Sequence, residues 1–196
     1  MQYYIYSLVC FLLPGTVWLI WNKGMIADKA YKVRHIIWIY IYLFYGYLAV
    51  QEAAGIGTIW DLIAYGKLDN SINLIPFSSE GAMTYILNII MFMPLGFLLP
   101  LIWKNFRNAK KVVLMGFLMS LAIEICQLFN IRTTDIDDLM MNTLGTLVGY
   151  CCWKVFSLIF RNAGTKCVEM NKSEPVIYMF GGILGLFLLY NWRVFN

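Results

Sequence analysis

Long apolar runs limit this chain to a small set of folds. Six stretches are apolar over lengths close to those that cross the core of a bilayer: 3–21, 36–50, 83–103, 112–129, 139–160 and 176–190. A transmembrane helix needs about 20 mostly apolar residues, and a helix satisfies its own backbone hydrogen bonds in lipid. The pattern therefore predicts an all-α, polytopic membrane helix bundle with about six transmembrane helices.

Two stretches leave the detail of this bundle open. The run 36–50 is short for a span unless its helix continues through Gln51 and Glu52. Residues 53–66, with the sequence AAGIGTIWDLIAYG, are apolar but interrupted by glycine and too short to cross a bilayer. We expect them to lie in the interface or to form a re-entrant segment. Since no soluble segment remains, we expect residues 1–196 to form a single transmembrane domain.

Basic residues are distributed unevenly among the connections. Of the 15 Lys and Arg residues, twelve lie in the first, third and fifth connections or beside them, and only Lys67, Arg132 and Arg193 lie elsewhere. Cytoplasmic loops of membrane proteins carry an excess of Lys and Arg. The bias predicts cytoplasmic basic loops, with the N- and C-termini outside. The outer side would then hold most of the acidic residues, namely Glu52, Asp61, Asp69, Glu80, Asp135, Asp137 and Asp138.

Several classes of site and partner find no support in the sequence. The five cysteines include no CxxC pair and no Cys/His cluster, so we expect neither a disulfide framework nor a structural metal site. The basic residues form no stripe interleaved with aromatic residues, which argues against a nucleic-acid partner. His35, the only histidine, follows a basic loop, and we expect it at the interfacial start of a helix.

Polar residues that are out of place in a membrane concentrate between 117 and 150. Glu124 lies within an apolar run, and a carboxylate there costs at least about 2.5 kcal/mol unless it faces the bundle interior or a polar cavity. Ser120, Glu124 and Gln127 recur at helical spacing and line one face. Asp138 and Asn142 do the same on the next helix, together with Gly145 and Gly149. These residues form a site hypothesis.

The rise of a helix places three of these polar side chains at similar depth. At about 1.5 Å per residue, Asn88 and Glu124 lie about 8 Å below the outer ends of their helices. Asn142 lies about 5 Å below the outer end of its own helix. We therefore predict one polar layer shared by the third, fourth and fifth spans.

Each of these features also has a purely structural explanation. Asp135 and Asp138 fit the N-cap and third position of a helix, where negative charge is favoured. Asn88 and Asn142 could be interhelical hydrogen-bonding residues, and the glycine repeats 145/149 and 181/185 could permit close helix packing. Glu124 needs a cationic partner, hydrogen-bond donors or a proton, and Arg132 is the nearest basic residue on the predicted outer side.

Several motifs, in order along the chain, resemble the VanZ-like family. They are NLIPF at 73–77, NIIMFMPLG at 88–96, the Ser120, Glu124 and Gln127 set, RTTDIDDL at 132–139, and Asn142-Thr143 with Gly145, Gly149 and Tyr150. The resemblance covers the core 73–150. It implies a small bacterial plasma-membrane protein with a role in the cell envelope. The founding member of the family is associated with low-level resistance to teicoplanin, a glycopeptide antibiotic that acts outside the cell.

Two functions remain open. In the first, an outward-facing polar pocket binds a membrane lipid, a lipid-linked cell-wall precursor, the antibiotic or a partner. In the second, the protein is an intramembrane enzyme or transporter for an anionic polyprenyl or phospholipid head group. The sequence offers no recognisable nucleophile constellation to decide for an enzyme. The candidate site residues are Asn73, Pro76, Phe77, Asn88, Glu124, Gln127, Arg132, Asp135, Asp137, Asp138 and Asn142.

The second function assigns chemistry to individual residues. Glu124 would act as proton carrier or base, and Arg132 would hold a phosphate group. Asp135, Asp137 and Asp138 could bind Mg²⁺ or Ca²⁺, which prefer carboxylate oxygens.

Overall fold

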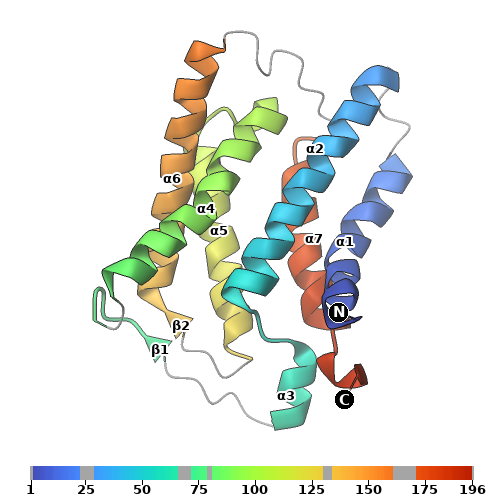
Figure 1. The fold of residues 1–196 in the computed structure, drawn as a ribbon, viewed down its shortest axis with the longest axis vertical. Coiled ribbons are helices and arrows are strands. Elements are labelled where there is room, and N and C mark those ends of the chain that lie inside the picture. Colours follow the sequence, from blue (N-terminus) through green and yellow to red (C-terminus); the bar gives the residue numbers. More distant parts are fainter. Residues whose placement is uncertain are drawn as a thin grey trace.

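The computed structural model describes residues 2–22, 29–65, 72–78, 81–129, 134–160 and 171–195. In this part of the chain, long helices run side by side (Figure 1). They are α1 (Gln2–Asn22), α2 (Lys29–Tyr47), α4 (Ala82–Ile102), α5 (Ala109–Gln127), α6 (Ile136–Ile159) and α7 (Glu174–Leu189). The structure confirms the all-α membrane bundle. By length and hydropathy, three helical segments of the described part qualify as membrane spans, namely Gln2–Asn22, Lys32–Gln51 and Ala82–Ile102.

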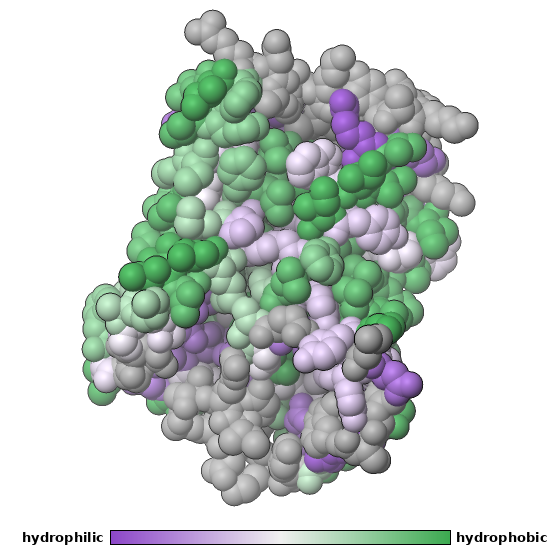
Figure 2. Space-filling view, viewed as in Figure 1, coloured by the Kyte–Doolittle hydropathy of each residue, from purple (hydrophilic) through white to green (hydrophobic). Residues whose placement is uncertain are grey.

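The surface of the bundle explains why it belongs in a membrane. Large apolar side chains are exposed along several helices, among them Leu13, Ile41, Ile90 and Leu114. Figure 2 shows hydrophobic residues over the middle of the visible face, with the most hydrophilic residues gathered mainly toward its two ends. Continuous apolar surface of this kind is rare on soluble monomers, whereas lipid tails cover it without cost.

The second apolar run is longer than its sequence alone indicates. After Tyr47 the helix continues as a π-helical segment, Leu48–Ala54, and ends at Gly55 in the left-handed conformation with φ 63°. The helix thus passes through Gln51 and Glu52. The run 36–50 is therefore part of a full-length helix and not a short span. The continuation brings the end of this helix beside α4 and α5.

The stretch 53–66 divides between two elements. Ala53 and Ala54 end the π-helical segment, and the helix α3 (Ile59–Tyr65) follows after a turn. Figure 1 places α3 beyond the ends of the long helices rather than between them, which favours the interfacial alternative over the re-entrant one. Trp60 ties it to α7 by donating its Nε1–H to the Leu188 carbonyl at 3.1 Å. Gly66 lies outside the described residues.

Glycines allow α4 and α6 to pack backbone against backbone. A Cβ added at Gly149 would lie 1.9 Å from the Met93 carbonyl oxygen, and one at Gly145 would lie 2.3 Å from the Ile89 carbonyl oxygen. On the opposite helix, a Cβ at Gly96 would lie 1.9 Å from the carbonyl oxygen of Thr146. The repeat at 145 and 149 therefore serves close helix approach, as predicted.

Four chain segments that matter for the site meet at one end of the bundle. The helices α2 and α5 finish there, α4 and α6 begin there, and both termini lie at the same end (Figure 1). Two short strands, β1 (Ile72–Asn73) and β2 (Thr134–Asp135), pair in parallel at that end, with Asn73 opposite Asp135. The pairing fixes the segments that lead into α4 and α6 relative to each other.

Because α4 and α6 approach each other closely, one methyl group added between them should strongly reduce the stability of the bundle. Gly149→Ala should destabilise the bundle by about 1–3 kcal/mol, because the helices must move apart to admit the Cβ. The measurement is the unfolding free energy of the purified protein in mixed micelles, titrated with a denaturing detergent.

Gly181→Ala on α7 is the matched control. Its added Cβ would meet Pro14 Cβ at 3.4 Å, an ordinary contact. We expect a change of at most about 1 kcal/mol, in the stabilising direction, from the better helix propensity of Ala. Equal stability of the two variants would contradict the packing described for α4 and α6.

Candidate functional site

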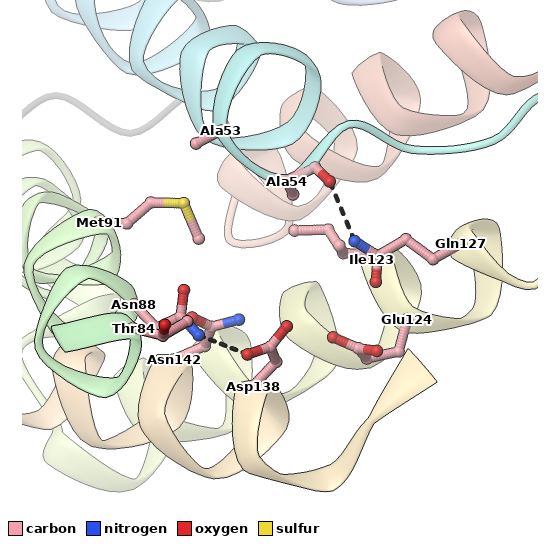
Figure 3. Close-up of a pocket in the computed structure, with 10 residues that line it drawn as sticks. All are labelled: Ala53, Ala54, Thr84, Asn88, Met91, Ile123, Glu124, Gln127, Asp138 and Asn142. Atoms are coloured by element: carbon pink, nitrogen blue, oxygen red, sulfur yellow. Dashed lines mark hydrogen bonds between the residues drawn. The ribbon is translucent and has the colours of Figure 1, made fainter. Parts of the chain in front are cut away.

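A cavity of about 350 Å³ lies at the end of the bundle where these segments meet. It is enclosed by α4, α5, α6 and the π-helical end of α2 (Figure 3). Its lining combines polar and apolar side chains: Ala53, Ala54, Thr84, Asn88, Met91, Ile123, Glu124, Gln127, Asp138 and Asn142. A polar cavity in an apolar bundle is where a membrane protein would hold the polar part of a ligand.

Two carboxyl groups face this cavity from neighbouring helices. Glu124 on α5 is only 4% exposed, and its Oε2 accepts a hydrogen bond from the backbone N–H of Asp135 at 3.1 Å. Asp138 lies in the first turn of α6, and its carboxyl group points into the same cavity as that of Glu124 (Figure 3).

Amide side chains complete the polar lining. Asn88 on α4 donates its Nδ2–H to Asp138 Oδ1, and Gln127 donates its Nε2–H to the Ala54 carbonyl at 3.0 Å. Asn142 donates its Nδ2–H to Ser120 Oγ at 2.9 Å. The structure thus brings Asn88, Glu124 and Asn142 around one cavity, in the arrangement that the helical spacing predicts. Their role in binding stays a prediction.

The side-chain oxygen of Asn142 lacks a hydrogen-bond partner among the described residues. Asn142 is 3% exposed, and its Oδ1 is buried with no hydrogen bond from this part of the chain. Buried polar atoms in proteins nearly always have a partner, either from the protein or from a bound molecule. This oxygen therefore marks a place where a donor would be favoured.

The acidic residues at the start of α6 have three different tasks. Asp135 is the N-cap, accepting from the Asp137 N–H at 2.9 Å, and it also accepts from Asn73 Nδ2 at 3.0 Å. The capping explanation is therefore correct for Asp135. Asp138 occupies the third helical position but turns its carboxyl group toward the cavity.

Asp137 anchors the turn that contains NLIPF. Its carboxylate is fully buried, and both oxygens accept from the Phe77 backbone N–H, at 2.8 and 3.0 Å. The Tyr85 hydroxyl donates to the same carboxylate at 2.9 Å. Phe77 has φ 61°, a left-handed conformation that is costly for a residue with a Cβ. The bonds to Asp137 hold this turn, in which Pro76 is exposed, against α4 and α6.

These contacts do not form the cation site considered for the three aspartates. Asp135, Asp137 and Asp138 bind different partners in different directions. Within the described ranges, no group of three or more His, Cys, Asp or Glu side chains is placed to hold a metal ion. As placed here, the three aspartates do not form one ligand set, and binding of Mg²⁺ or Ca²⁺ at these residues stays a prediction.

Arg132, the predicted cationic partner of Glu124, lies outside the described residues, so that pairing stays a prediction. Other contributors to the site escaped the sequence interpretation. Tyr85 lies one helical turn before Asn88, so helical spacing could have identified it. Ala53, Ala54 and Met91 carry no comparable signal, because only the tertiary packing brings them to the cavity.

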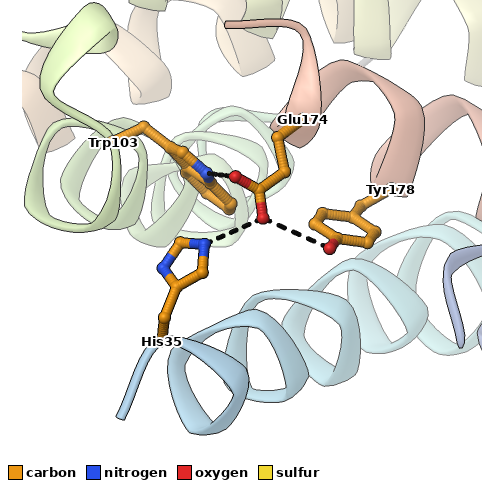
Figure 4. A network of polar contacts seen from close by, with 4 residues as sticks. All are labelled: His35, Trp103, Glu174 and Tyr178. Carbon is orange, nitrogen blue, oxygen red and sulfur yellow. Dashed lines mark hydrogen bonds and ion pairs between the residues drawn. The ribbon is translucent and has the colours of Figure 1, made fainter. Parts of the chain in front are cut away.

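A second buried polar cluster, drawn in Figure 4, joins the start of α2, the end of α4 and the start of α7, which lie at the other end of the bundle from the cavity. His35 Nε2 lies 2.8 Å from Glu174 Oε1, while the indole N–H of Trp103 and the hydroxyl of Tyr178 also donate to Glu174. His35 is 5% exposed, so it is buried against its partners rather than exposed at the helix start, and its position at the membrane interface stays a prediction. A buried carboxylate is costly without partners. Glu174 at the start of α7 finds its partners on α2 and at the end of α4, so the cluster fastens α7 to these two helices.

Comparison with known proteins identifies the family of this chain. The sequence model of the VanZ/LLP1 family matches residues 5–158, which include the first two long helices as well as the core 73–150. The chain belongs to the VanZ family. It is similar to Protein VanZ of Enterococcus faecium, with 34% identity over 134 residues, or 67% of this chain and 77% of the relative. No solved structure matches this VanZ-family chain.

The anchoring role of Asp137 predicts a local rather than a global effect. Asp137→Ala removes the acceptor of two donors, the Phe77 N–H, which is shared between both carboxylate oxygens, and the Tyr85 hydroxyl; hydrogen bonds to charged groups are worth about 1.5–3 kcal/mol each. Backbone amides of 72–78 should then exchange hydrogen roughly ten- to a hundredfold faster, as measured by hydrogen-exchange mass spectrometry.

Asp61→Ala serves as the matched control. Asp61 accepts from the backbone N–H and the hydroxyl of Thr58, both at 2.8 Å, and so anchors a different turn at the same end. In this variant, exchange should rise around 55–61 and stay unchanged at 72–78. Unchanged protection of 72–78 in Asp137→Ala would refute the anchoring role.

Proposed function

We propose that this VanZ-family protein acts in the bacterial plasma membrane, where its cavity faces the outer side and binds the polar part of an amphiphile. The amphiphile would be a membrane lipid, a lipid-linked cell-wall precursor or a glycopeptide antibiotic that carries a lipid tail. Occupation of such a site lowers the access of the antibiotic to its target. The observation that carries the proposal is the cavity, which gathers two acids and three amides inside an apolar bundle.

The lining supports an amphiphile rather than a wholly polar ligand. Glu124, Asp138 and Asn142 supply polar atoms, whereas Ala53, Ala54 and Met91 supply an apolar wall. A few convergent polar groups in a pocket fix the orientation of a ligand. A polar head group would meet the acids, and its hydrocarbon part would lie along the apolar wall.

The distribution of charge supports the orientation. Most of the described basic residues, but not Arg193, lie toward the end of the bundle away from the cavity, among them Lys104, Lys110 and Lys111 at the turn between α4 and α5. The acids Asp61, Asp135, Asp137 and Asp138 lie at the cavity end. By the positive-inside rule, the cavity end and both termini are extracellular.

A second candidate function rests on the pair of carboxyl groups. Two acids on one cavity, in different surroundings, are the arrangement that general acid–base catalysis uses. Glu124 has a backbone donor, and Asp138 has the Asn88 amide. In this alternative, the protein modifies or transports a lipid head group, and Glu124 transfers the proton.

The orientation is tested with single cysteines. In a variant whose five natural cysteines are replaced by serine, Ser78→Cys should react with a membrane-impermeant maleimide in intact cells. Lys110→Cys should react only after the cells are opened. The reverse pattern would place the cavity on the cytoplasmic side and overturn the proposed function.

Glu124 variants separate binding from proton transfer. In a susceptible host, the wild type should raise the teicoplanin concentration needed to stop growth. Glu124→Gln keeps the shape and loses the charge, so a binding site should weaken roughly ten- to a hundredfold and retain partial resistance at higher expression. An acid–base mechanism should instead lose resistance at every expression level.

Asp61→Asn is the control, since it removes one acid at the same end without touching the cavity. It should preserve resistance at equal protein abundance. Full resistance of Glu124→Gln at low expression would contradict both proposed roles of the cavity.

A further inference from the structure

The turn between β1 and α4, residues 72–78, presents apolar side chains at the cavity end of the bundle. Leu74, Ile75 and Phe77 are 69%, 68% and 63% exposed, and Pro76 between them is exposed as well. The sequence of the turn, INLIPFS, contains no charged residue. Exposed apolar side chains gathered in one place mark a surface that binds a partner or a membrane.

The conformation of Phe77 indicates that its side chain matters, and not only the path of the backbone. Its φ of 61° is easy for glycine and costly for a residue with a Cβ. A turn that only joined β1 to α4 would be more stable with glycine at this position. The chain instead holds a phenylalanine there, bonded through its backbone N–H to Asp137, with most of the side chain exposed. The side chain therefore has a task outside the turn.

Backbone groups in the middle of the turn are bonded within the protein. The Ile75 N–H donates to Asn73 Oδ1 at 3.2 Å, and the Ile75 carbonyl accepts from Ser78 Oγ at 2.7 Å. The Phe77 N–H donates to Asp137. Unpaired backbone groups are costly in lipid, so these bonds favour a turn that can enter a leaflet with its apolar side chains first.

The exposed side of the turn continues a surface that faces lipid. On α4, Met83, Ile86 and Ile90 are exposed and lie on one face at helical spacing. The turn lies on the flank of the bundle beside the first residues of α4 (Figure 1). The ring of Phe77 makes a T-shaped contact with Tyr85 of α4, with centroids 6.0 Å apart. The apolar surface of α4 and that of the turn are therefore neighbours.

The length of α4 gives the depth of the turn. The 21 residues of this helix extend about 31 Å, close to the hydrocarbon thickness of about 30 Å. The start of α4 therefore lies near the boundary between hydrocarbon and head groups, and the turn 72–78 lies at the same level. Apolar and aromatic side chains are favoured at this boundary.

We propose that the turn 72–78 inserts Leu74, Ile75 and Phe77 into the lipid leaflet at the cavity end of the bundle, as an interfacial anchor. The insertion is shallow, about 5–10 Å, as for other interfacial apolar segments, so water still reaches the polar side of the turn. Because Asp137 ties the turn to the start of α6, the anchor holds the cavity end of α6 at a fixed level in the membrane. The anchor does not depend on what the cavity binds.

Spin labels at single cysteines measure the depth of the turn. In the background without natural cysteines, Leu74→Cys, Ile75→Cys and Phe77→Cys are each labelled with a nitroxide, in nanodiscs that hold one chain. Oxygen collects in lipid and a nickel chelate stays in water, so the ratio of their collisions with the label reports its depth. Ile90→Cys on α4 is the lipid reference, and Lys110→Cys, exposed at the other end of the bundle, is the water reference.

The three labels on the turn should lie between the two references, about 5–10 Å into the leaflet. Collision ratios equal to that of Lys110→Cys would place the turn in water and overturn the anchor. Labels shielded from both oxygen and nickel would show that another part of the chain covers the turn, and would overturn it as well. Neither result would touch the proposed function, which the Glu124 variants test separately.

Phe77→Gly separates the anchor from the fold of the turn. Glycine adopts φ 61° without strain, so hydrogen exchange of residues 72–78 should not rise, whereas the label at Ile75 should move toward the water reference. Phe77→Leu is the matched control, since it keeps an apolar side chain and should keep the depth. A label at Ile75 that stays equally deep in Phe77→Gly would contradict the part of Phe77 in the anchor.

Discussion

The contact between the backbones of α4 and α6 determines the geometry of this protein. Gly96, Gly145 and Gly149 leave no room for a Cβ, so the two helices meet at carbonyl oxygens rather than through side chains. In a bilayer the hydrophobic effect does not drive helices together, and packing of small residues does so instead. The same crossing places Asn88 of α4 beside Asp138 of α6, at the end where the cavity forms.

The start of α6 shows how one short acidic segment can serve structure and site together. Asp135 caps the helix, Asp137 holds the turn around Phe77, and Asp138 faces the cavity with Glu124. The first two tasks use up carboxylates that would otherwise be available to a cation. They also hold β1 and the following turn over the beginnings of α4 and α6, so the cavity is built on fixed elements.

The periodic features of this chain could be predicted from its sequence, because the helix has a fixed period and rise. From the period and the rise, Asn88, Glu124 and Asn142 are expected at similar depth. The N-cap preference of aspartate predicts a helix start at Asp135. Contacts between distant segments could not be predicted this way. His35 and Glu174 are 139 positions apart, and their pairing depends on how α7 docks. The role of Asp137 likewise depends on where the turn before α4 lies.

The central claim is that α4 and α6 bring Asn88 and Asp138 together at the cavity in the membrane. Dibromobimane tests it most directly, because it becomes fluorescent only when both of its arms have reacted with neighbouring thiols. In membranes containing a cysteine-free background with Asn88→Cys and Asp138→Cys, we predict a fluorescent, internally bridged monomer, and no such product from either single variant. A double variant whose two thiols are both alkylated by a small maleimide but never bridged would contradict the account.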